Sequence, residues 1–468
     1  MSETFDVVFI GAGPGGYVGA IRAAQLGMKT AVIEKDKTLG GTCLNVGCIP
    51  SKALLESSEH YHAAIHDLST HGVLTGEVKL DLAKMMARKD KIVRELTSGI
   101  EFLFKKNKIT RIKGKGRILK PGQIEVQTDE GQTQVVQTRH IVIATGSTPV
   151  ELPFLKFDEK RIVSSTGALS LPEVPRSLAV VGGGVIGLEM GSVWQRLGSK
   201  VTVIEYAPHL CGAMDRETIS VLQKVLKKEG MEFMLSTKVT ASRVLSDGVE
   251  LDYESLTDGK KASLKADVVL VATGRRPYSA GLGCEEVGIQ KDPQGRIIID
   301  QHYQTTVPEI YAIGDVVAGP MLAHKAEEEG VAVAEILAGQ AGHVNYATVP
   351  SVIYTHPEVA SVGLTEEQAK EKGLNVNIGK FPFMANGRAK ALGFTEGFVK
   401  IIADAKTDRI LGGHIVGPRA SELLGEIVVC MEFGGSSEDL ARSFHSHPTL
   451  TEVIREAALA VEKRQRQM

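Results

Sequence analysis

Two cysteines separated by four residues are the side chains of this sequence with the clearest capacity for chemistry. Cys43 and Cys48 lie in the run GGTCLNVGCIPSK. A C-x₄-C pair can serve zinc, but a zinc site needs a second pair of ligands, and Cys211, Cys284 and Cys430 are isolated from one another. Two thiols packed in a core are the plainer alternative. We favour a redox-active disulfide that exchanges electrons with a neighbouring cofactor, and we predict no metal site.

A histidine and a glutamate near the C-terminal end form a second candidate group. Imidazole titrates in the range in which a dithiol has to lose a proton before it attacks a disulfide, which makes His447 a candidate base. A carboxylate bonded to the other ring nitrogen, here Glu452, would fix the tautomer and stabilise the imidazolium. A histidine near a chain end is more often structural or exposed, and His445 is a competing candidate.

Two glycine-rich turns occur in the same context, each between an apolar run and a helix-forming stretch. An acidic residue follows the first glycine at the same spacing in both copies. The residues are Gly11, Gly13, Gly16 and Glu34 in the first copy, and Gly182, Gly184, Gly187 and Glu205 in the second. One such motif is weak evidence, but two in matched strand–turn–helix–strand contexts predict two dinucleotide sites.

The glycines and acids of these turns have separate physical roles. The first glycine makes the turn, the second lets the backbone approach a pyrophosphate, and the third packs helix against strand. The helix N-terminus supplies N–H donors to the phosphates. The acids can bond ribose hydroxyls, which favours nucleotides without a 2′-phosphate. Two dinucleotides in one chain indicate an electron path between a flavin and a nicotinamide.

The elements that position these residues are predicted as strands and helices of an α/β fold. Apolar runs over 5–10 and 178–181 lead into the turns, and runs over 141–146 and 268–274 end at a glycine, as the last strand of a nucleotide-binding unit would. We therefore expect two Rossmann-like domains. The region 346–468 mixes strands and helices, which predicts a C-terminal α+β domain.

Composition excludes several classes of protein. At roughly 100–200 residues per domain, 468 residues suggest two to four domains. A net charge of −2 argues against a protein that coats nucleic acid or a membrane surface. No apolar run approaches the ~18 residues that span a bilayer, and Met1 to Asp6 shows no secretory signal. Five cysteines are too few for a disulfide scaffold. We expect a soluble intracellular protein.

The runs GAGPGG and GGTCLNVGCIPSK together resemble the FAD-dependent pyridine nucleotide–disulfide oxidoreductases. The resemblance covers essentially the whole chain and continues through TVPEIYAIGD, MLAH and HSHPTLTE. It implies an FAD-binding domain over 1–147, an NAD-binding domain over 148–276, a central domain over 277–345 that completes the FAD site, and a dimerisation domain over 346–468.

Position by position, the resemblance implies two sets of cofactor contacts. Those to FAD, beyond the first glycine turn and Glu34, are Thr42, Lys52, Gly116, Thr145, Gly146, Ser147, Asp315, Met321, Leu322, Ala323 and His324. Those to NAD are Gly182, Gly184, Gly187, Glu189, Glu205, Val239 and Gly274. Lys52 matches the lysine beside the flavin ring, and Glu189 its ion-pair partner. From residue type alone, Lys52 would be a surface lysine, and Asp315 a helix N-cap or a ligand of the ribityl hydroxyls.

The activity implied is oxidation of protein-bound dihydrolipoyl groups by NAD⁺. Cys43 would be attacked by the substrate, Cys48 would lie nearer the flavin, and His447 with Glu452 would come from the partner subunit of a homodimer. Lipoylated acyltransferases or the glycine cleavage H-protein would be the partners, in the cytoplasm, or in the mitochondrial matrix if a transit peptide has been removed.

Three alternatives to this activity stay open at this point. Glutathione reductases usually carry arginines after the second acid-bearing strand, and here the run is EYAP. Mercuric reductases carry an extra C-terminal cysteine pair, and no cysteine follows Cys430. A flavoprotein that serves mainly as a binding or structural subunit would not need all of Cys43, Cys48, His447 and Glu452.

Overall fold

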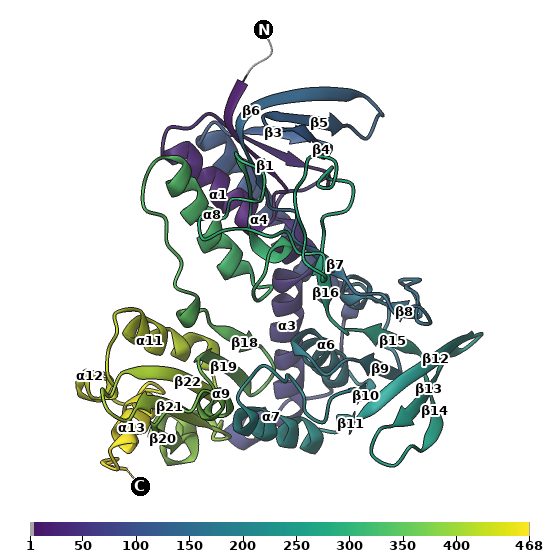
Figure 1. Ribbon diagram of the computed structural model, residues 1–468. Helices are drawn as coiled ribbons and strands as arrows, with labels where there is room; N and C mark the ends of the chain where they lie inside the picture. Colours follow the sequence, from purple (N-terminus) through teal and green to yellow (C-terminus); the bar gives the residue numbers. More distant parts are fainter. Residues whose placement is uncertain (1–3, 468) are drawn as a thin grey trace. The chain divides into compact units, whose positions relative to one another are not determined.

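The computed structural model describes residues 4–467, so Met1 to Glu3 of the N-terminal segment discussed above lie outside the described residues. The chain divides into two compact units, whose elements are labelled in Figure 1. The first comprises Met1–Leu54, Asp81–Val150 and Gly274–Val344, and the second Leu55–Leu80, Glu151–Thr273 and Asn345–Met468.

The first unit is organised around a sheet in the order β3-β2-β1-β6-β5-β4, with β17 also paired to β6. Strands β3, β2, β1, β6 and β17 run parallel, while β4, β5 and β6 are antiparallel neighbours. Its strands are β1 Thr4–Ile10, β2 Thr30–Glu34, β3 Thr110–Lys113, β4 Lys115–Lys120, β5 Gln123–Gln127, β6 Thr133–Ile143 and β17 Ile310–Ala312, with the separate pair β7 Ser147–Pro149 and β16 Arg275–Pro277. Its helices are α1 Pro14–Gln25, α2 Gly41–Val46, α4 Leu82–Lys106 and α8 Ala323–Leu337, with the turn η2 Gly314–Val316 and the start of α3 Cys48–His66.

Strand β1 shows why this sheet is buried on both faces. Val7 and Phe9 pack with α1, α4 and α8, whereas Val8 and Ile10 pack with residues of β4, β5 and the segment 282–317. Parallel strands covered on both sides are apolar in succession instead of alternating, as the run VVFI is. This burial fixes the carboxyl end of β1, where the first glycine turn begins.

The second unit contains a parallel sheet in the order β11-β10-β9-β15-β8 and an antiparallel sheet β12-β13-β14. Their strands are β8 Ile162–Val163, β9 Ser177–Val181, β10 Lys200–Ile204, β11 Glu232–Met234, β12 Thr237–Leu245, β13 Gly248–Ser255, β14 Lys261–Ala266 and β15 Val268–Val271. The helices are α5 Ser165–Ala168, α6 Val185–Arg196 and α7 Arg216–Lys228, with the remainder of α3 and η1 Leu68–His71. Trp194 on α6 is fully buried, and its indole N–H donates to Ala168 O at 3.0 Å.

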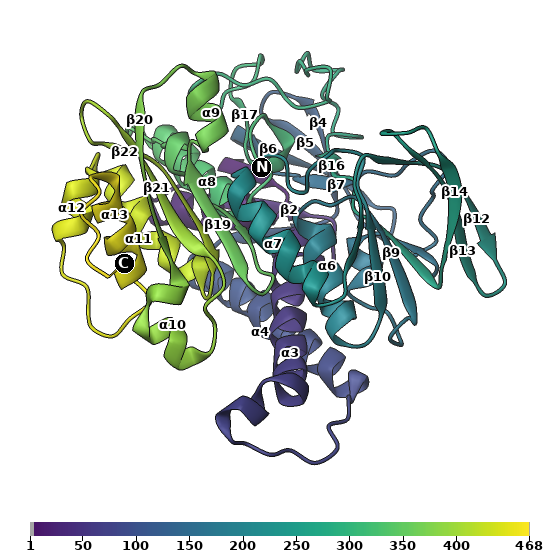
Figure 2. The same cartoon turned by 90° about the horizontal axis from the view of Figure 1, so that it is seen from below.

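The C-terminal part of the second unit is an antiparallel sheet, β18-β19-β22-β21-β20 (Figure 2). Its elements are β18 Ser351–Ile353, β19 Glu358–Gly363, β20 Val376–Pro382, β21 Phe398–Asp404, β22 Ile410–Gly417, α9 Glu366–Glu371, α10 Gly387–Leu392, α11 Ala420–Glu432, α12 Ser437–Arg442 and α13 Glu452–Val461, with the short turns η3 Tyr346–Thr348 and η4 Phe383–Ala385. Alternate residues of β21, such as Val399 and Ile401, pack in one core with α11 and α13, and the residue between them, Lys400, faces the other way toward α7. The predicted fold class, two Rossmann-like domains with a C-terminal α+β domain, is confirmed.

The boundaries between units fall close to the predicted domain seams, at Val150, Gly274 and Asn345. Residues 55–80 group with the second unit, where the Arg196 guanidinium lies 2.8 Å from Glu59. The division into four functional domains remains a prediction. No helix among residues 4–467 is long and apolar enough to cross a membrane.

Candidate active site

Cys43 and Cys48 lie on consecutive helices of the first unit. Cys43 is on α2 and Cys48 is the first residue of α3. Neither is disulfide-bonded in the structure, but their side chains are within hydrogen-bonding contact. This contact, with burial, raises the pKa of the half-buried Cys43, while Cys48 is exposed. A thiolate at Cys48 would be stabilised by the positive end of α3. Reduction of a disulfide between the two residues could therefore leave a half-buried thiol at Cys43 and an exposed thiolate at Cys48.

The cysteine run is tied to the first glycine turn by backbone contacts. Gly40 donates its N–H to Ala12 O at 2.9 Å, which joins the segment before α2 to the turn. A Cβ on Gly41, whose φ is +57°, would lie 2.6 Å from the Cα of Gly13. Thr42 follows directly on α2. These contacts place the redox pair beside the first nucleotide motif.

The acid of the first copy points back at its own turn. Glu34 accepts the Ala12 N–H on Oε2 and the Asp36 N–H on Oε1, both at 2.8 Å. Burial raises the pKa of Glu34, and the two N–H donors oppose that rise. At the start of the turn Gly11 has φ +105°, and a Cβ on Gly16 would lie 1.9 Å from Gly11 O. The turn therefore requires glycine at both positions.

The predicted FAD contacts Ser147 and Asp315 meet in the first unit. Ser147 Oγ donates to Asp315 Oδ2 at 2.6 Å, and Thr145 Oγ1 donates to Tyr278 O at 2.6 Å. Arg275 donates from Nε to Ser147 Oγ and from a terminal nitrogen to Ser147 O, both at 2.8 Å. Burial lowers the pKa of Arg275. Sequence reasoning missed Arg275 because its role depends on the pairing of β7 with β16.

A buried ion pair on α8 holds the turn that carries Asp315. Lys325 Nζ lies 3.1 Å from Glu329 Oε1, with side chains 0% and 1% exposed. Glu329 accepts the Gly314 N–H at 2.7 Å, and Lys325 donates to Gly314 O at 3.1 Å. These two residues, which follow the run MLAH one and five positions later, were also missed by sequence reasoning.

The other predicted FAD contacts belong to the same unit without forming one cluster. Gly116 lies on β4, where a Cβ would be 3.2 Å from Ile10 Cγ2. Gly146, with φ +71°, accepts the Tyr278 N–H on its carbonyl at 2.9 Å. Met321, Leu322, Ala323 and His324 form the N-terminal end of α8, where Leu322 is the N-cap.

Two further side chains lie beside Cys43. Tyr17, on α1, packs against the same apolar core as Cys43 and hydrogen-bonds Glu327 on α8. Burial, together with the charge of Glu327 and its hydrogen bond, raises the pKa of Tyr17 to about 12. Burial also raises the pKa of Glu327. Nothing in the sequence pattern singled out this pair, since the two residues are brought together by the packing of α1 on α8.

The second copy repeats the geometry of the first. Glu205 accepts the Gly183 N–H on Oε2 at 2.5 Å and the Ala207 N–H on Oε1 at 2.7 Å. Gly182 has φ +111°, and a Cβ on Gly187 would lie 2.2 Å from Gly182 O. No side chain caps the N-terminal end of α1 or α6, and an uncapped helix start after a glycine turn is the arrangement that binds a pyrophosphate.

Of the remaining predicted NAD contacts, Val239 is buried on β12 next to a bulge of that strand. Gly274, with φ +127°, belongs to the first unit and accepts the Val150 N–H. Glu189, buried on α6, accepts the Tyr354 N–H at 3.0 Å. Lys52 is in the first unit and Glu189 in the second, so their ion pair remains a prediction.

His447 and Glu452 are in contact in the C-terminal part of the second unit. His447 Nδ1 lies 3.0 Å from Glu452 Oε1, and Thr449 donates its N–H to Oε2 at 3.0 Å. Burial alone would raise the pKa of Glu452, but these hydrogen bonds hold it below its usual value. The imidazole is 77% exposed, which leaves Nε2 accessible. The group can therefore accept a proton on one nitrogen and stabilise it through the other.

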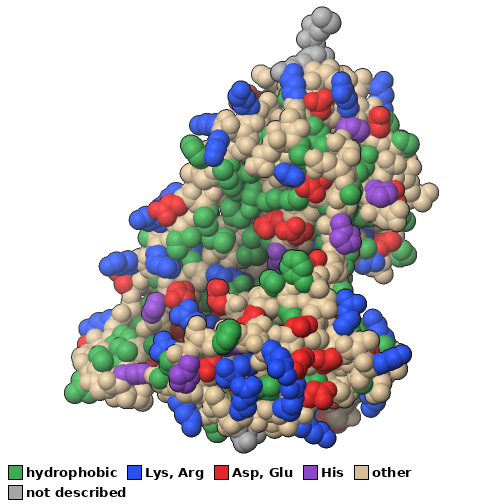
Figure 3. Space-filling model, turned by 90° about the vertical axis from the view of Figure 1, so that its left-hand side faces the viewer, with side chains coloured by type: hydrophobic (Ala, Val, Ile, Leu, Met, Phe, Trp, Pro, Cys, Tyr) green, Lys and Arg blue, Asp and Glu red, His purple; other side chains and the backbone are tan. Residues whose placement is uncertain are grey.

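His445 has a different environment. Its side chain is 2% exposed, its Nε2 lies 2.7 Å from Glu426 Oε1, and its Nδ1 lies 2.9 Å from Ser443 O. Protein oxygens thus lie close to both nitrogens of His445, whereas Nε2 of His447 is accessible. The same part of the chain exposes Val429, Phe433 and Phe444. Figure 3, which faces the side of α11 and α12 in Figure 1, shows hydrophobic side chains reaching the surface among charged ones.

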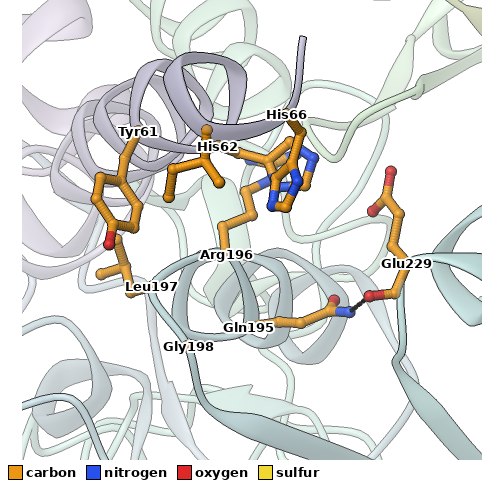
Figure 4. Close-up of a pocket in the computed structure, with 9 residues that line it drawn as sticks. Tyr61, His62, His66, Gln195, Arg196, Leu197, Gly198 and Glu229 are labelled. Carbon is orange, nitrogen blue, oxygen red and sulfur yellow. Dashed lines mark hydrogen bonds between the residues drawn. The ribbon is translucent and has the colours of Figure 1, made fainter. Parts of the chain in front are cut away.

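A cavity of about 250 Å³ in the second unit is separate from the predicted site residues (Figure 4). Its wall includes His62 and His66 of α3, whose ring centroids are 4.5 Å apart, and Arg196 at the end of α6. Glu229 lies across from the histidines, and burial raises its pKa to about 7. Within residues 4–467, no group of three or more His, Cys, Asp and Glu side chains is arranged to hold a metal ion.

Comparisons with known proteins match this description. A family described as pyridine nucleotide-disulphide oxidoreductase matches residues 5–330, and the dimerisation domain of that family matches residues 349–458. The chain is 56% identical to the mitochondrial dihydrolipoyl dehydrogenase of Pisum sativum, over 98% of this chain and 92% of the relative. It is 54% identical to a leghemoglobin reductase of Glycine max, over 98% and 88%.

The fold also matches a solved structure, LpdA from Mycobacterium tuberculosis, with a TM-score of 0.89 and 28% identity over 97% of this chain and 99% of the other. The two ranges matched by the family include both glycine turns, the cysteine run and His447. On this evidence the chain belongs to the pyridine nucleotide-disulphide oxidoreductase family.

Proposed function

We propose that this chain is a dihydrolipoyl dehydrogenase, which oxidises protein-bound dihydrolipoyl groups with NAD⁺ through FAD and a redox-active disulfide. The observation that carries the proposal is the Cys43–Cys48 pair, held on the first glycine turn by the Gly40–Ala12 hydrogen bond. The 56% identity to a dihydrolipoyl dehydrogenase over nearly the full length supports the same substrate class.

The residues of both turns fit the two cofactors. Each turn combines a glycine at positive φ, a helix start without a side-chain cap and a carboxylate bonded to the turn. We assign FAD to the first copy, because the redox pair is attached there, and NAD to the second. Glu205 has no arginine in the run that follows it, which favours NAD over NADP.

The protein's own groups can perform the thiol chemistry. His447 takes a proton from a dihydrolipoyl thiol, and Glu452 stabilises the imidazolium. The substrate thiolate attacks Sγ of Cys43 in the disulfide, and Cys48 leaves as a thiolate at the start of α3. The second substrate thiol displaces Cys43, which releases the lipoyl disulfide and leaves two electrons in the cysteine pair. The cofactors supply the acceptors, FAD for these electrons and NAD⁺ for the resulting hydride.

We further propose a homodimer in which His447 acts on the Cys43–Cys48 pair of the partner subunit. The match to a family dimerisation domain over 349–458 and the exposed Phe433 and Phe444 support this association. Lipoylated acyltransferase subunits or the glycine cleavage H-protein would bring the substrate, in the cytoplasm or the mitochondrial matrix. Relatives named as mitochondrial are consistent with the second location.

Anaerobic titration with dihydrolipoamide tests the proposal directly. We expect the flavin-loaded protein to develop a thiolate–flavin charge-transfer band on reduction. Cys48→Ser should lose the band, and both Cys43→Ser and Cys48→Ser should lose lipoamide turnover while keeping FAD. Retention of more than a few per cent of the turnover by either variant would exclude the disulfide mechanism.

The histidine pair provides a matched test of the base. His447→Gln should slow dithiol oxidation by about 10²- to 10⁴-fold, whereas NADH-driven flavin reduction should be unaffected. His445→Gln is the control, since His445 faces Glu426 inside the fold. Mixed dimers of Cys43→Ser and His447→Gln chains should regain one intact site. If such heterodimers form and stay inactive, the base and the disulfide belong to the same subunit.

A further inference from the structure

Lys400, on β21 of the region matched to the dimerisation domain, is a buried cation that contacts three carboxylates. Its side chain is 1% exposed, and Nζ lies 3.1 Å from Asp215 Oδ2, 2.8 Å from Glu217 Oε2 and 3.1 Å from Glu366 Oε2. Burial alone would lower the pKa of Lys400, but the carboxylates hold it above its usual value, so the amine stays charged. Removing Lys400 would leave the Asp215 carboxylate, which is 0% exposed, buried without this cation, whereas Glu217 and Glu366 are 41% and 51% exposed.

Asp215 connects this cluster to the second nucleotide turn. Its side chain is 0% exposed, and it accepts the Thr218 N–H at 3.1 Å as the N-cap of α7. Four residues earlier, Cys211 has a left-handed backbone with φ +43° and donates its N–H to Gly183 O at 3.1 Å. Its Sγ also lies 3.5 Å from Gly183 O. The segment 211–215 is thus attached to Gly183 at its first residue and to Lys400 at its last.

The loop that contains Cys211 packs against the turn without spare room. Leu210 is buried, and a Cβ on Gly183 would lie 2.5 Å from Leu210 Cδ2 and 3.2 Å from Glu205 Oε2. Met214 donates its N–H to Cys211 O at 2.9 Å, which keeps the loop compact up to Asp215. A movement of Asp215 is therefore transmitted to the glycine turn and to the carboxylate beside it.

We propose that Lys400 is a positioning residue for NAD⁺ binding, which acts through Asp215 and the loop Leu210–Met214 on the turn around Gly183. This inference rests on the proposed function, in which that turn binds NAD⁺. It assigns to the dimerisation domain a role in nucleotide binding, and to Cys211, for which the sequence suggested no function, the role of attaching the loop to the turn.

Steady-state kinetics of the flavin-loaded full chain test the inference. Lys400→Met should raise the KM for NAD⁺ by about tenfold, with kcat at saturating NAD⁺ changed by less than about twofold. The KM for dihydrolipoamide and the rate of flavin reduction by dihydrolipoamide should not change. A fall in kcat with an unchanged KM for NAD⁺ would overturn the inference.

Lys380→Met is the matched control. Lys380 lies directly opposite Lys400 on β20, but it contacts Glu217 alone among these carboxylates, at 2.5 Å, and is 47% exposed. It should leave the KM for NAD⁺ within about twofold, because its contact is with Glu217, which is 41% exposed, and not with the buried Asp215 that leads to the loop. An equal effect of both substitutions would mean that Lys400 acts through overall charge, and the inference would be wrong.

Asp215→Asn covers the case in which Lys400→Met does not fold. Asparagine keeps the N-cap of α7 but removes the charge that Lys400 binds. It should raise the KM for NAD⁺ as Lys400→Met does, and the double variant should add little. An unchanged KM in Asp215→Asn would refute the inference.

Glu205→Gln separates this inference from the proposed function beneath it. If Glu205→Gln does not raise the KM for NAD⁺, the second turn is not the NAD⁺ site, and both ideas fail. If Glu205→Gln raises it and Asp215→Asn does not, the site assignment stands and the role of Lys400 is disproved.

Discussion

The two glycine-rich turns have nearly the same backbone and different surroundings. The first glycines of the two turns have φ +105° and +111°. In each copy the acid accepts two backbone N–H groups, one from the residue after the first glycine and one from the residue two positions after the acid. The helices after them, α1 and α6, have the same length. The chain thus contains the same turn conformation twice, and each copy is stabilised by contacts within its own segment.

The difference lies in what packs against each turn. In the first copy α8 lies against α1 so closely that a Cβ on Gly15 would be 2.8 Å from Ala326 O, and one on Gly330 2.5 Å from Gly15 O. In the second copy Ile186 occupies the position that corresponds to Gly15. There the loop around Cys211, and not a helix, packs against the turn. The redox cysteines are attached to the first copy. On the proposed assignment, each turn would bind a dinucleotide, and the elements packed against it would determine which dinucleotide binds.

Substituting the first glycine of each copy should give the largest effects and separate the two sites. A Cβ would lie 2.5 Å from Ala144 O in Gly11→Ala and 2.4 Å from Ala272 O in Gly182→Ala, and both backbones are left-handed. We expect Gly11→Ala to purify without flavin absorbance. Gly182→Ala should keep the flavin and lose nearly all NAD⁺-dependent turnover. Loss of flavin from Gly182→Ala would show that the copies are assigned the wrong way round.

The acids should differ in their effect on nicotinamide choice. Glu205 would bond a ribose diol and repel a 2′-phosphate, so the ratio of kcat/KM for NAD⁺ over NADP⁺ should be on the order of a hundredfold or more. Glu205→Gln should reduce this ratio, and Glu34→Gln, with flavin supplied, should not. Equal kcat/KM values for the two nicotinamides in the unsubstituted protein would contradict the role of Glu205.

The glycine contact between α1 and α8 should affect the flavin more mildly. Gly15→Ala forces α8 away from α1, and with it the Met321–His324 segment that we assign to the flavin. We expect flavin affinity, measured by equilibrium dialysis, to fall by about tenfold. Gly99→Ala on α4 is the control, because a Cβ there meets nothing within 4 Å. That variant should bind flavin normally and be slightly more stable.

The smallest effect is expected at the cavity that borders α7 in the second unit. Burial raises the pKa of Glu229 to about 7, so its contribution to stability is fully present below its ordinary pKa and is lost as the pH rises through 7. Glu229→Gln should therefore raise Tm at pH 8, and raise it less at pH 5. The rise at pH 8 should be only about 1 °C, because Glu229 is more than a third exposed.

Glu232→Gln is a control of opposite sign for this measurement. Lys200 holds the pKa of Glu232 below its usual value, so the ionised carboxylate stabilises the fold above its ordinary pKa. This variant should lose stability at pH 8. A Glu229→Gln variant that is less stable than the parent at pH 8 would disprove the account of the cavity.

The sequence predicted the turns because their requirements are local. Gly11 and Gly182 must be glycine because their φ is positive and an added Cβ would collide with a carbonyl oxygen. The spacing from these glycines to Glu34 and Glu205 follows from the length of one helix and one strand. The α/β fold class followed from the same repeat. The contact of His447 with Glu452 was also within reach, since only four residues separate them.

The residues that support the site could not be predicted in this way. Arg275 contacts Ser147 because β16 pairs with β7, and Tyr17 contacts Glu327 because α8 packs on α1. The cluster around Lys400 joins residues that are 185 positions apart in the sequence. Such contacts depend on how the helices and strands pack in three dimensions, and no short-range pattern in the sequence indicates them.

Trp194 gives the second unit its own optical signal. It is the one tryptophan of the sequence, and it is fully buried on the helix that follows the second glycine turn. Its emission on denaturation therefore reports the exposure of that unit alone, whereas a bound flavin would report on the first. Recording both in one unfolding experiment would show whether the two units lose their structure together or in separate steps.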